Sequence, residues 1–173
     1  MGWNITIYNN IYNIQNNKIM IIYIMENIPE RYIPNRMTKK DRNIQRKNIV
    51  KSRKMYKKGI FKNRKTVKSF KTEPSIHIKN AMRIYNIKNV KPTKELVKKT
   101  GCSMKGLKEI VKKGMGAYYS SGSRPNQTPL SWGYARLGSS ITGNKASIVD
   151  YHILEKECID ESVALKLAKK NKK

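Results

Sequence analysis

Residues 114–146 constrain the fold most, because their composition differs sharply from that of the rest of the chain. The stretch contains six of the ten glycines, three tyrosines and one of the two tryptophans. It has three basic residues and no acidic residue, whereas lysines crowd the segments on either side. A nearly uncharged segment rich in glycine, serine and aromatic residues is typical of a closely packed unit, since glycine lets neighbouring backbones approach. We therefore expect the rest of the chain to be organised around this stretch.

The chain as a whole is strongly basic. The 173 residues include 38 Lys and Arg against 11 Asp and Glu, a formal net charge of +27. So large an excess of positive charge repels itself and favours a polyanionic partner. Nucleic acid is the expected partner, DNA more than RNA, and an anionic membrane surface is the alternative.

The first 24 residues carry a single charged side chain, Lys18, and are rich in Asn, Ile and Tyr. Their apolar run, residues 19–25, is much shorter than the about 20 residues that a transmembrane helix needs. The segment also lacks the basic start and the cleavage site of a secretory signal. We therefore predict no membrane segment and no secretion, and treat residues 1–24 as an apolar, Asn-rich leader. A start of translation at Met25 is an equally good interpretation of the change in composition.

Residues 25–73 are predicted to form a basic, partly disordered arm that contains one helix. Thr38 has the spacing of a capping residue and predicts a helix over residues 39–58, which a glycine ends. The apolar residues of this helix do not fall on one clean face, so we expect it to become ordered on a phosphate backbone. Residues 61–70 show no clear periodicity and are predicted to be a loop.

A compact, mainly α-helical domain is expected over residues 74–169, and residues 170–173 are predicted to be a basic tail. Pro74 suits the first position of a helix. Apolar side chains then recur at i, i+3, i+4 and i+7, which predicts one buried face.

Three more helices are expected in the second half of this domain. Thr128 is predicted to cap a helix over residues 129–142, with a proline at its first position. A short helix is expected over residues 150–157. The last helix is predicted over residues 161–169, with Asp160 as its cap.

The clearest motif is residues 93–114, TKELVKKTGCSMKGLKEIVKKG. Thr93 and Ser103 can each cap a short helix, Gly101 permits the positive φ of a tight turn, and Gly114 is expected to end the second helix. Two short helices joined in this way resemble the helix-turn-helix of DNA-binding proteins. A groove-binding module and a purely structural hairpin both fit the pattern.

Seven residues are candidate contacts to nucleic acid. The outer face of the second helix carries lysines, which bind phosphate readily and read bases poorly, so binding is expected to be largely independent of sequence. Arg124 and Arg136 can each contact phosphate or pair with Asp150. Tyr119 and Trp132 are candidates for stacking on bases, and core packing is the alternative for Trp132. The candidate contacts are Lys105, Lys108, Lys112, Arg124, Arg136, Tyr119 and Trp132.

Nothing in the sequence indicates catalysis, a metal or a bound cofactor. His77 and His152 stand apart, and no nucleophile motif, metal-ligand set or spaced pair of carboxylates is present. The glycine-containing loop at residues 122–124 lacks the P-loop pattern, so a small-molecule ligand is not expected. Cys102 and Cys158 are too few and too far apart for a zinc site or a disulfide framework, and both are expected to be reduced and buried.

The segment from Arg124 to Leu154 reads RPNQTPLSWGYARLGSSITGNKASIVDYHIL. It resembles the signature block of an uncharacterised family of small basic proteins of nucleocytoplasmic large DNA viruses, such as mimivirus- and phycodnavirus-like giants. A looser form of the block is similar to segments of tailed-phage proteins. The resemblance covers about residues 25–158 and carries over no activity and no site residue. It implies a viral origin, with a location in the virion or in the viral factory of the infected cell.

Taken together, these features predict a viral nucleic-acid-binding protein that contacts phosphates without marked sequence specificity, and not an enzyme. The first alternative is a structural virion protein, such as a minor capsid or cement protein whose basic arm lies between acidic subunits. The second alternative is an enzyme of unknown type.

Overall fold

The computed structural model describes residues 28–171, and the predicted leader and the last two residues of the predicted tail lie outside this range. The described chain is helical and contains no strand apart from one isolated bridge, which confirms the mainly α fold class. Its helices are η1 (Glu30–Tyr32), α2 (Lys39–Tyr56), α3 (Ile76–Tyr85), α4 (Lys94–Thr100), α5 (Met104–Ser120), α6 (Pro129–Ile141), α7 (Lys145–Val149), α8 (Tyr151–Glu157) and α9 (Val163–Lys170).

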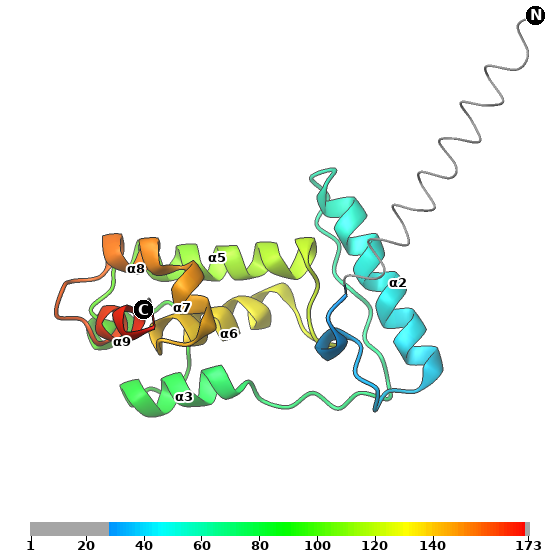
Figure 1. The fold of residues 1–173 in the computed structure, drawn as a ribbon, viewed down its shortest axis with the longest axis horizontal. Coiled ribbons are helices and arrows are strands. Elements are labelled where there is room, and N and C mark those ends of the chain that lie inside the picture. The colour runs from blue at the N-terminus through cyan, green and yellow to red at the C-terminus, as the bar shows by residue number, and fades with distance from the viewer. Residues whose placement is uncertain (1–27, 172–173) are drawn as a thin grey trace, which may run out of the picture.

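Helices α5 and α6 run antiparallel, side by side, at the centre of the fold (Figure 1). Their backbones meet at two glycines. A Cβ atom on Gly114 would lie 2.7 Å from the Cα of Gly133, and one on Gly133 would lie 2.8 Å from the carbonyl oxygen of Val111. The expectation that Gly114 ends the helix is therefore wrong: α5 continues to Ser120, because this glycine makes the helix contact rather than a cap.

The core surrounds this helix pair. Helix α3 packs on α6 at Gly138, where an added Cβ would lie 2.7 Å from the carbonyl oxygen of His77. The hydroxyl of Tyr85 in α3 donates a hydrogen bond to the carbonyl oxygen of Ile141 at 2.5 Å. Fully buried side chains from α4, α5, α6, α8 and α9 complete one apolar cluster, among them Leu96, Leu107, Ile110, Leu137, Ile141, Leu154 and Leu165.

Local caps explain most helix boundaries. Thr38, Thr93, Ser103 and Thr128 each accept a hydrogen bond from a backbone N–H in the first turn of the helix that follows, as predicted. At the last helix the prediction was wrong, because Ser162 and not Asp160 is the cap of α9. The short helix α7 was not predicted.

Cys102 and Cys158 form a disulfide, so the expectation that both are reduced is wrong. Cys102 lies in the turn between α4 and α5, and Cys158 directly follows α8. The N–H of Ser103 donates to the carbonyl oxygen of Glu157, and the N–H of Ile159 donates to that of Gly101. These backbone bonds pair the two segments antiparallel and bring the sulfur atoms together.

Helix α2 lies beyond the end of the α5–α6 pair and is steeply inclined to both helices (Figure 1). Its buried residues are Asp41, Gln45, Ile49 and Ser52, so the buried face is mostly polar. The Gln45 side-chain amide donates to the carbonyl oxygens of Tyr32 and Ser123 at 3.1 and 3.2 Å. A polar buried face explains why the apolar residues of this helix show no helical period.

The connection between α2 and α3, residues 57–75, runs back along α2 and is bound to the helical body. The guanidinium of Arg64 lies 3.5 Å from the ring centroid of Tyr118 and donates to the Ser123 hydroxyl at 2.6 Å. Burial lowers the pKa of Arg64 to about 10. The Asn126 side chain accepts from the Val67 N–H at 2.8 Å and donates to two carbonyl oxygens of the connection.

We predict that Gly114→Ala destabilises the protein by about 1–3 kcal/mol, because the new methyl group collides with the backbone of α6. Gly116→Ala is the matched control, since its Cβ would meet only the Tyr56 hydroxyl, at 3.4 Å. That change should be neutral, or stabilise by up to about 1 kcal/mol through helix propensity. Urea unfolding of the two variants measures the difference, and equal stabilities would contradict the proposed backbone contact.

A second prediction concerns the disulfide, which joins residues 56 positions apart. A cross-link that closes a loop of this length raises the free energy of unfolding by about 4 kcal/mol, because it lowers the entropy of the unfolded chain. The double variant Cys102→Ala, Cys158→Ala should lose about that much, measured by urea unfolding without reductant. Dithiothreitol should destabilise the wild type and leave the variant unchanged; a wild type indifferent to reductant would count against the bond.

Candidate nucleic-acid interface

Residues 42–72 contain 13 Lys and Arg and no acidic residue. On α2, four exposed lysines recur at i, i+7, i+11 and i+14. At 3.6 residues per turn they fall within an arc of about 60°, on the side of the helix away from its buried face, and extend over about 21 Å. We call these four residues the lysine stripe: Lys40, Lys47, Lys51 and Lys54.

The connection adds like charge beside this stripe. The positive charge of Lys51, together with its hydrogen-bonding contact, holds the pKa of Lys62 below its usual value, and Lys65 adds to the effect. The side-chain amide of Asn48 in α2 donates to the carbonyl oxygen of Lys65 at 3.4 Å, which keeps this part of the connection against the helix. Within residues 28–171 no salt bridge involves these three lysines. The fold therefore concentrates positive charge here, and in the described part of the chain none of these three lysines is paired with a carboxylate.

A groove of about 550 Å³ lies where η1 meets the ends of α2 and α5. Arg53 donates from its Nε and from a terminal nitrogen to the carbonyl oxygen of Ser121, at 3.2 and 2.6 Å. The Arg31 guanidinium lies 5.1 Å from the ring centroid of Tyr32. Half of the lining residues are basic and none is acidic: Pro29, Arg31, Tyr32, Arg53, Lys54, Lys57, Ser120 and Ser121.

The lysines predicted from the helix-turn-helix pattern are exposed on one side of α5: Lys105, Lys108 and Lys112. Lys105 forms a salt bridge with Glu157 at 3.5 Å. The predicted turn is present, with Gly101 at φ 70°. However, a Cβ on Gly106 would lie 2.5 Å from the Cβ of Glu157, so the C-terminal end of α8 covers the first turn of α5. In helix-turn-helix proteins that turn enters the DNA groove, so the packing favours the structural alternative for this hairpin.

The remaining candidates lie in three different environments. Arg124 is exposed, whereas Arg136 pairs with a carboxylate of the body. Tyr119 is 8% exposed and stacks parallel to Tyr56, with ring centroids 6.1 Å apart. Trp132 is half-buried and packs edge-on against Tyr32 at 5.7 Å, which favours the core alternative for this residue. The structure thus gives these residues different surroundings, and Tyr119 lies against α2, the helix that carries the lysine stripe. The stripe itself was overlooked, although its spacing is present in the sequence.

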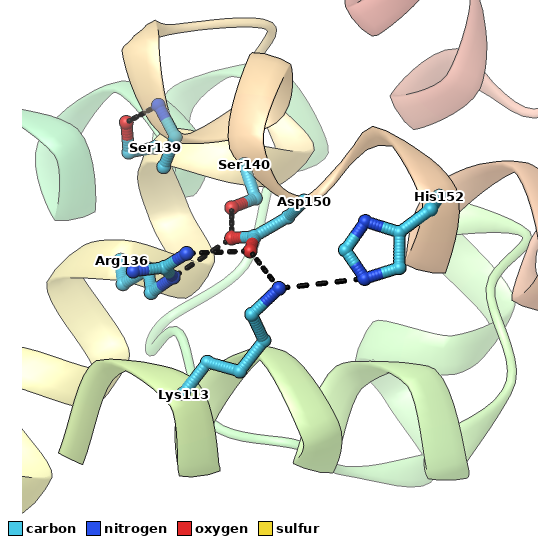
Figure 2. A network of polar contacts seen from close by, with 7 residues as sticks. Lys113, Arg136, Ser139, Ser140, Asp150 and His152 are labelled. Carbon is cyan, nitrogen blue, oxygen red and sulfur yellow. Dashed lines mark hydrogen bonds and ion pairs between the residues drawn. The ribbon is translucent and has the colours of Figure 1, made fainter. Parts of the chain in front are cut away.

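The carboxylate that pairs with Arg136 belongs to Asp150, which is fully buried (Figure 2). It accepts hydrogen bonds from Arg136 at 2.9 and 2.6 Å and from the Ser140 hydroxyl at 2.7 Å. The amine of Lys113 lies 3.3 Å from Asp150 and 3.4 Å from Nε2 of His152. Burial favours a raised pKa of Asp150, but the hydrogen bonds from Arg136 and Ser140 and the charge of Arg136 hold that pKa below its usual value.

This network joins α5, α6 and the start of α8, and its carboxylate is fully occupied by protein partners. Within the described residues, no group of three or more His, Cys, Asp or Glu side chains is arranged to hold a metal ion. No helix in the same part of the chain is both long enough and apolar enough to cross a bilayer. The network therefore stabilises the helical body, and the exposed basic surfaces lie elsewhere.

We predict that Asp150→Asn costs about 3 kcal/mol of stability at pH 7, because it leaves two cations without their buried partner. Since the folded pKa is below the unfolded value of about 3.9, the stability from ionised Asp150 is complete above that value. It is lost as pH falls through the folded pKa. The gap between variant and wild type in urea unfolding should therefore shrink below about pH 4.

Asp160→Asn is the matched control for this prediction, because Asp160 is exposed in the loop before α9. That variant should unfold like the wild type across the pH range. An Asp150→Asn protein as stable as wild type at pH 7 would contradict a structural role for the network.

A search of curated proteins and a search of solved structures found no match to the chain. A family model matches residues 29–153, from η1 to α8, and so includes α2, the connection and the Asp150 network. Membership of a family without assigned activity is thereby shown, while the signature block and a viral origin stay predictions. Because the match covers well over half of the 173 residues, the chain belongs to the family of unknown function DUF5824.

Proposed function

We propose that the protein binds nucleic acid through its phosphates, and that α2 and the connection make the main contact. The observation that carries this proposal is the lysine stripe together with the contact of Lys51 and Lys62. Like charges held side by side repel one another, as the lowered pKa of Lys62 reflects. A polyanion at this surface relieves the repulsion and releases its own condensed counterions, which favours binding.

The shape of the surface fits a linear polyanion better than a small anion. The stripe extends over about 21 Å along one side of a helix. Duplex DNA carries one negative charge for about each 1.7 Å of its axis, so phosphates are available along this whole length. Lysine contacts phosphate as a point charge and reads base edges poorly, so the binding is largely independent of sequence.

The helix is also held in place before any ligand arrives. Gln45 and Arg64 tie α2 and the connection to the loop at Ser123. Binding therefore does not have to order this surface, which spares the entropy that a flexible basic arm would lose. The basic groove at Arg31 and Lys57 adjoins the end of the stripe and offers further phosphate contacts.

The resemblance of residues 124–154 to small basic proteins of large DNA viruses favours DNA as the polyanion. It also supports a place with the viral genome, in the virion or in the viral factory. A structural virion protein is the alternative. If that alternative holds, the protein remains with capsids after nuclease treatment and does not bind purified DNA.

The test is the salt dependence of binding to a labelled duplex. The triple variant Lys47→Gln, Lys51→Gln, Lys54→Gln should lower affinity by about 10–100-fold at about 0.1 M salt. It should also reduce the slope of log K against log salt by about 3, one for each lysine that no longer meets a phosphate. Fluorescence anisotropy at several salt concentrations measures both, and urea unfolding should show no loss of stability because the three residues are exposed.

A matched double variant, Lys108→Gln with Lys112→Gln, tests the sequence-based candidates on α5. If this variant loses affinity and the triple variant does not, the main contact lies on α5. If the pure wild type binds neither DNA nor RNA in dilute buffer, nucleic-acid binding itself is wrong.

A further inference from the structure

Among the Phe, Tyr and Trp residues within residues 28–171, Phe61 alone is exposed rather than buried or half-buried, with 66% of its surface accessible. It follows the turn that ends α2. Single exposed apolar side chains are common on protein surfaces and need no explanation. What distinguishes Phe61 is the way in which its ring is held and the charge around it.

Two tyrosine rings fix the orientation of Phe61. Its centroid is 5.7 Å from that of Tyr56, with the planes at 77°, and 5.3 Å from that of Tyr119, with the planes at 78°. Tyr56 and Tyr119 stack parallel to each other, at 6°. The Tyr119 hydroxyl also donates to the side chain of Asn63, two residues after Phe61. The ring is thus rigidly supported from α2 and α5 while most of its surface faces solvent.

Positive charge surrounds this ring. Lys62 directly follows Phe61 in the sequence, Lys58 precedes it by three residues, and both lysines are exposed. Lys62 contacts Lys51, so Phe61 lies next to the lysine stripe. No acidic residue occurs between Asp41 and Glu73. A supported aromatic ring among phosphate-binding cations is the arrangement by which proteins hold unpaired nucleotides, with bases stacked on the ring and the backbone on the cations.

We propose that Phe61 is a stacking platform for an unpaired base, and that the nucleic acid bound at the end of the lysine stripe is single-stranded. This inference rests on the proposed function and specifies its ligand. Bases within a duplex are already stacked on their neighbours and cannot reach the ring without unpairing. A single strand presents free base faces, and every base has one, so the contact is tolerant of sequence.

The structure also assigns a role to Tyr119, which the sequence suggested as a stacking residue. Because Tyr119 is 8% exposed and packs against Phe61, it is a positioning residue that supports the platform. The ring that meets the base is that of Phe61.

The experiment compares a fluorescein-labelled oligothymidylate with a labelled hairpin duplex, each titrated with the full chain. Phe61→Ala should weaken binding of the single strand by about 5–100-fold, the range found when a base-stacking ring is removed. Its affinity for the duplex should stay within about twofold, and its salt slope should not change, because every phosphate-binding lysine is retained. Phe61→Trp should keep the single-strand affinity.

Two further variants separate stacking from packing. Phe61→Leu keeps apolar bulk against Tyr56 and Tyr119 but has no ring, so it should lose as much single-strand affinity as Phe61→Ala. Ile60→Ala is the matched control: Ile60 is the adjacent exposed apolar residue, 47% accessible, and its loss should change neither affinity.

The outcomes distinguish this inference from the proposed function. If the Phe61 variants bind the single strand as wild type does, or lose single-strand and duplex binding equally, the stacking platform is wrong while phosphate binding stands. If Phe61→Leu binds the single strand normally, the residue is an apolar contact for another partner and the inference is likewise wrong. If wild type binds neither ligand at low salt, the proposed function fails first.

Discussion

The contact between the backbones of α5 and α6 at Gly114 and Gly133 determines where the other parts of the protein lie. Lys113 precedes one of these glycines, and Arg136 follows the other by three residues. Their close approach therefore brings both cations to one carboxylate, that of Asp150, which joins α8 to the pair. Larger residues at the glycines would separate the helices and pull the two cations away from Asp150.

The surface is strongly basic because the chain has few acidic residues. Of 11 Asp and Glu, several are engaged within the protein. Asp41 accepts from the backbone of the connection, Asp150 lies in the buried network, and Glu157 accepts from the hydroxyl of Ser103. These three carboxylates hold segments together, and none of the other acidic residues occurs within residues 42–72. The exposed lysines of α2 and the connection are consequently left to act together on an external anion.

Local capping made much of the helical structure predictable. A Thr or Ser that bonds to a backbone N–H three residues later depends only on its own neighbourhood, so the starts of α2, α4, α5 and α6 could be located from sequence. Gly114 was misassigned because a glycine that ends a helix and a glycine that meets another helix look alike locally. The disulfide depends on the pairing of segments 56 residues apart, which no local pattern reveals.

A strongly basic surface was predictable from the composition, but its place on the fold was not. Net charge indicated a polyanion, yet it could not show which lysines act together. On α2 the failure had a specific cause: the buried face consists largely of polar side chains whose partners are backbone groups of distant segments, as with Gln45 and the carbonyl oxygen of Ser123. Without an apolar stripe the helix looked unpacked, so its exposed side could not be identified. The lysine period was nonetheless in the sequence, and a search for charge periodicity could have found it.

Formation of this interface is coupled to folding of the helical body. The two rings that support Phe61 are those of Tyr56 in α2 and Tyr119 in α5. The neighbouring ring of Tyr118 in α5 packs against Tyr119 and against the Arg64 guanidinium of the connection. The lysine stripe and the exposed ring consequently have fixed relative positions only when α2 is docked on the end of α5. Phosphate contacts weaken as salt screens them, whereas stacking on a ring does not depend on charge. In the proposed interface the lysines hold a flexible strand by its backbone, and the ring adds a preference for bases that are free to stack.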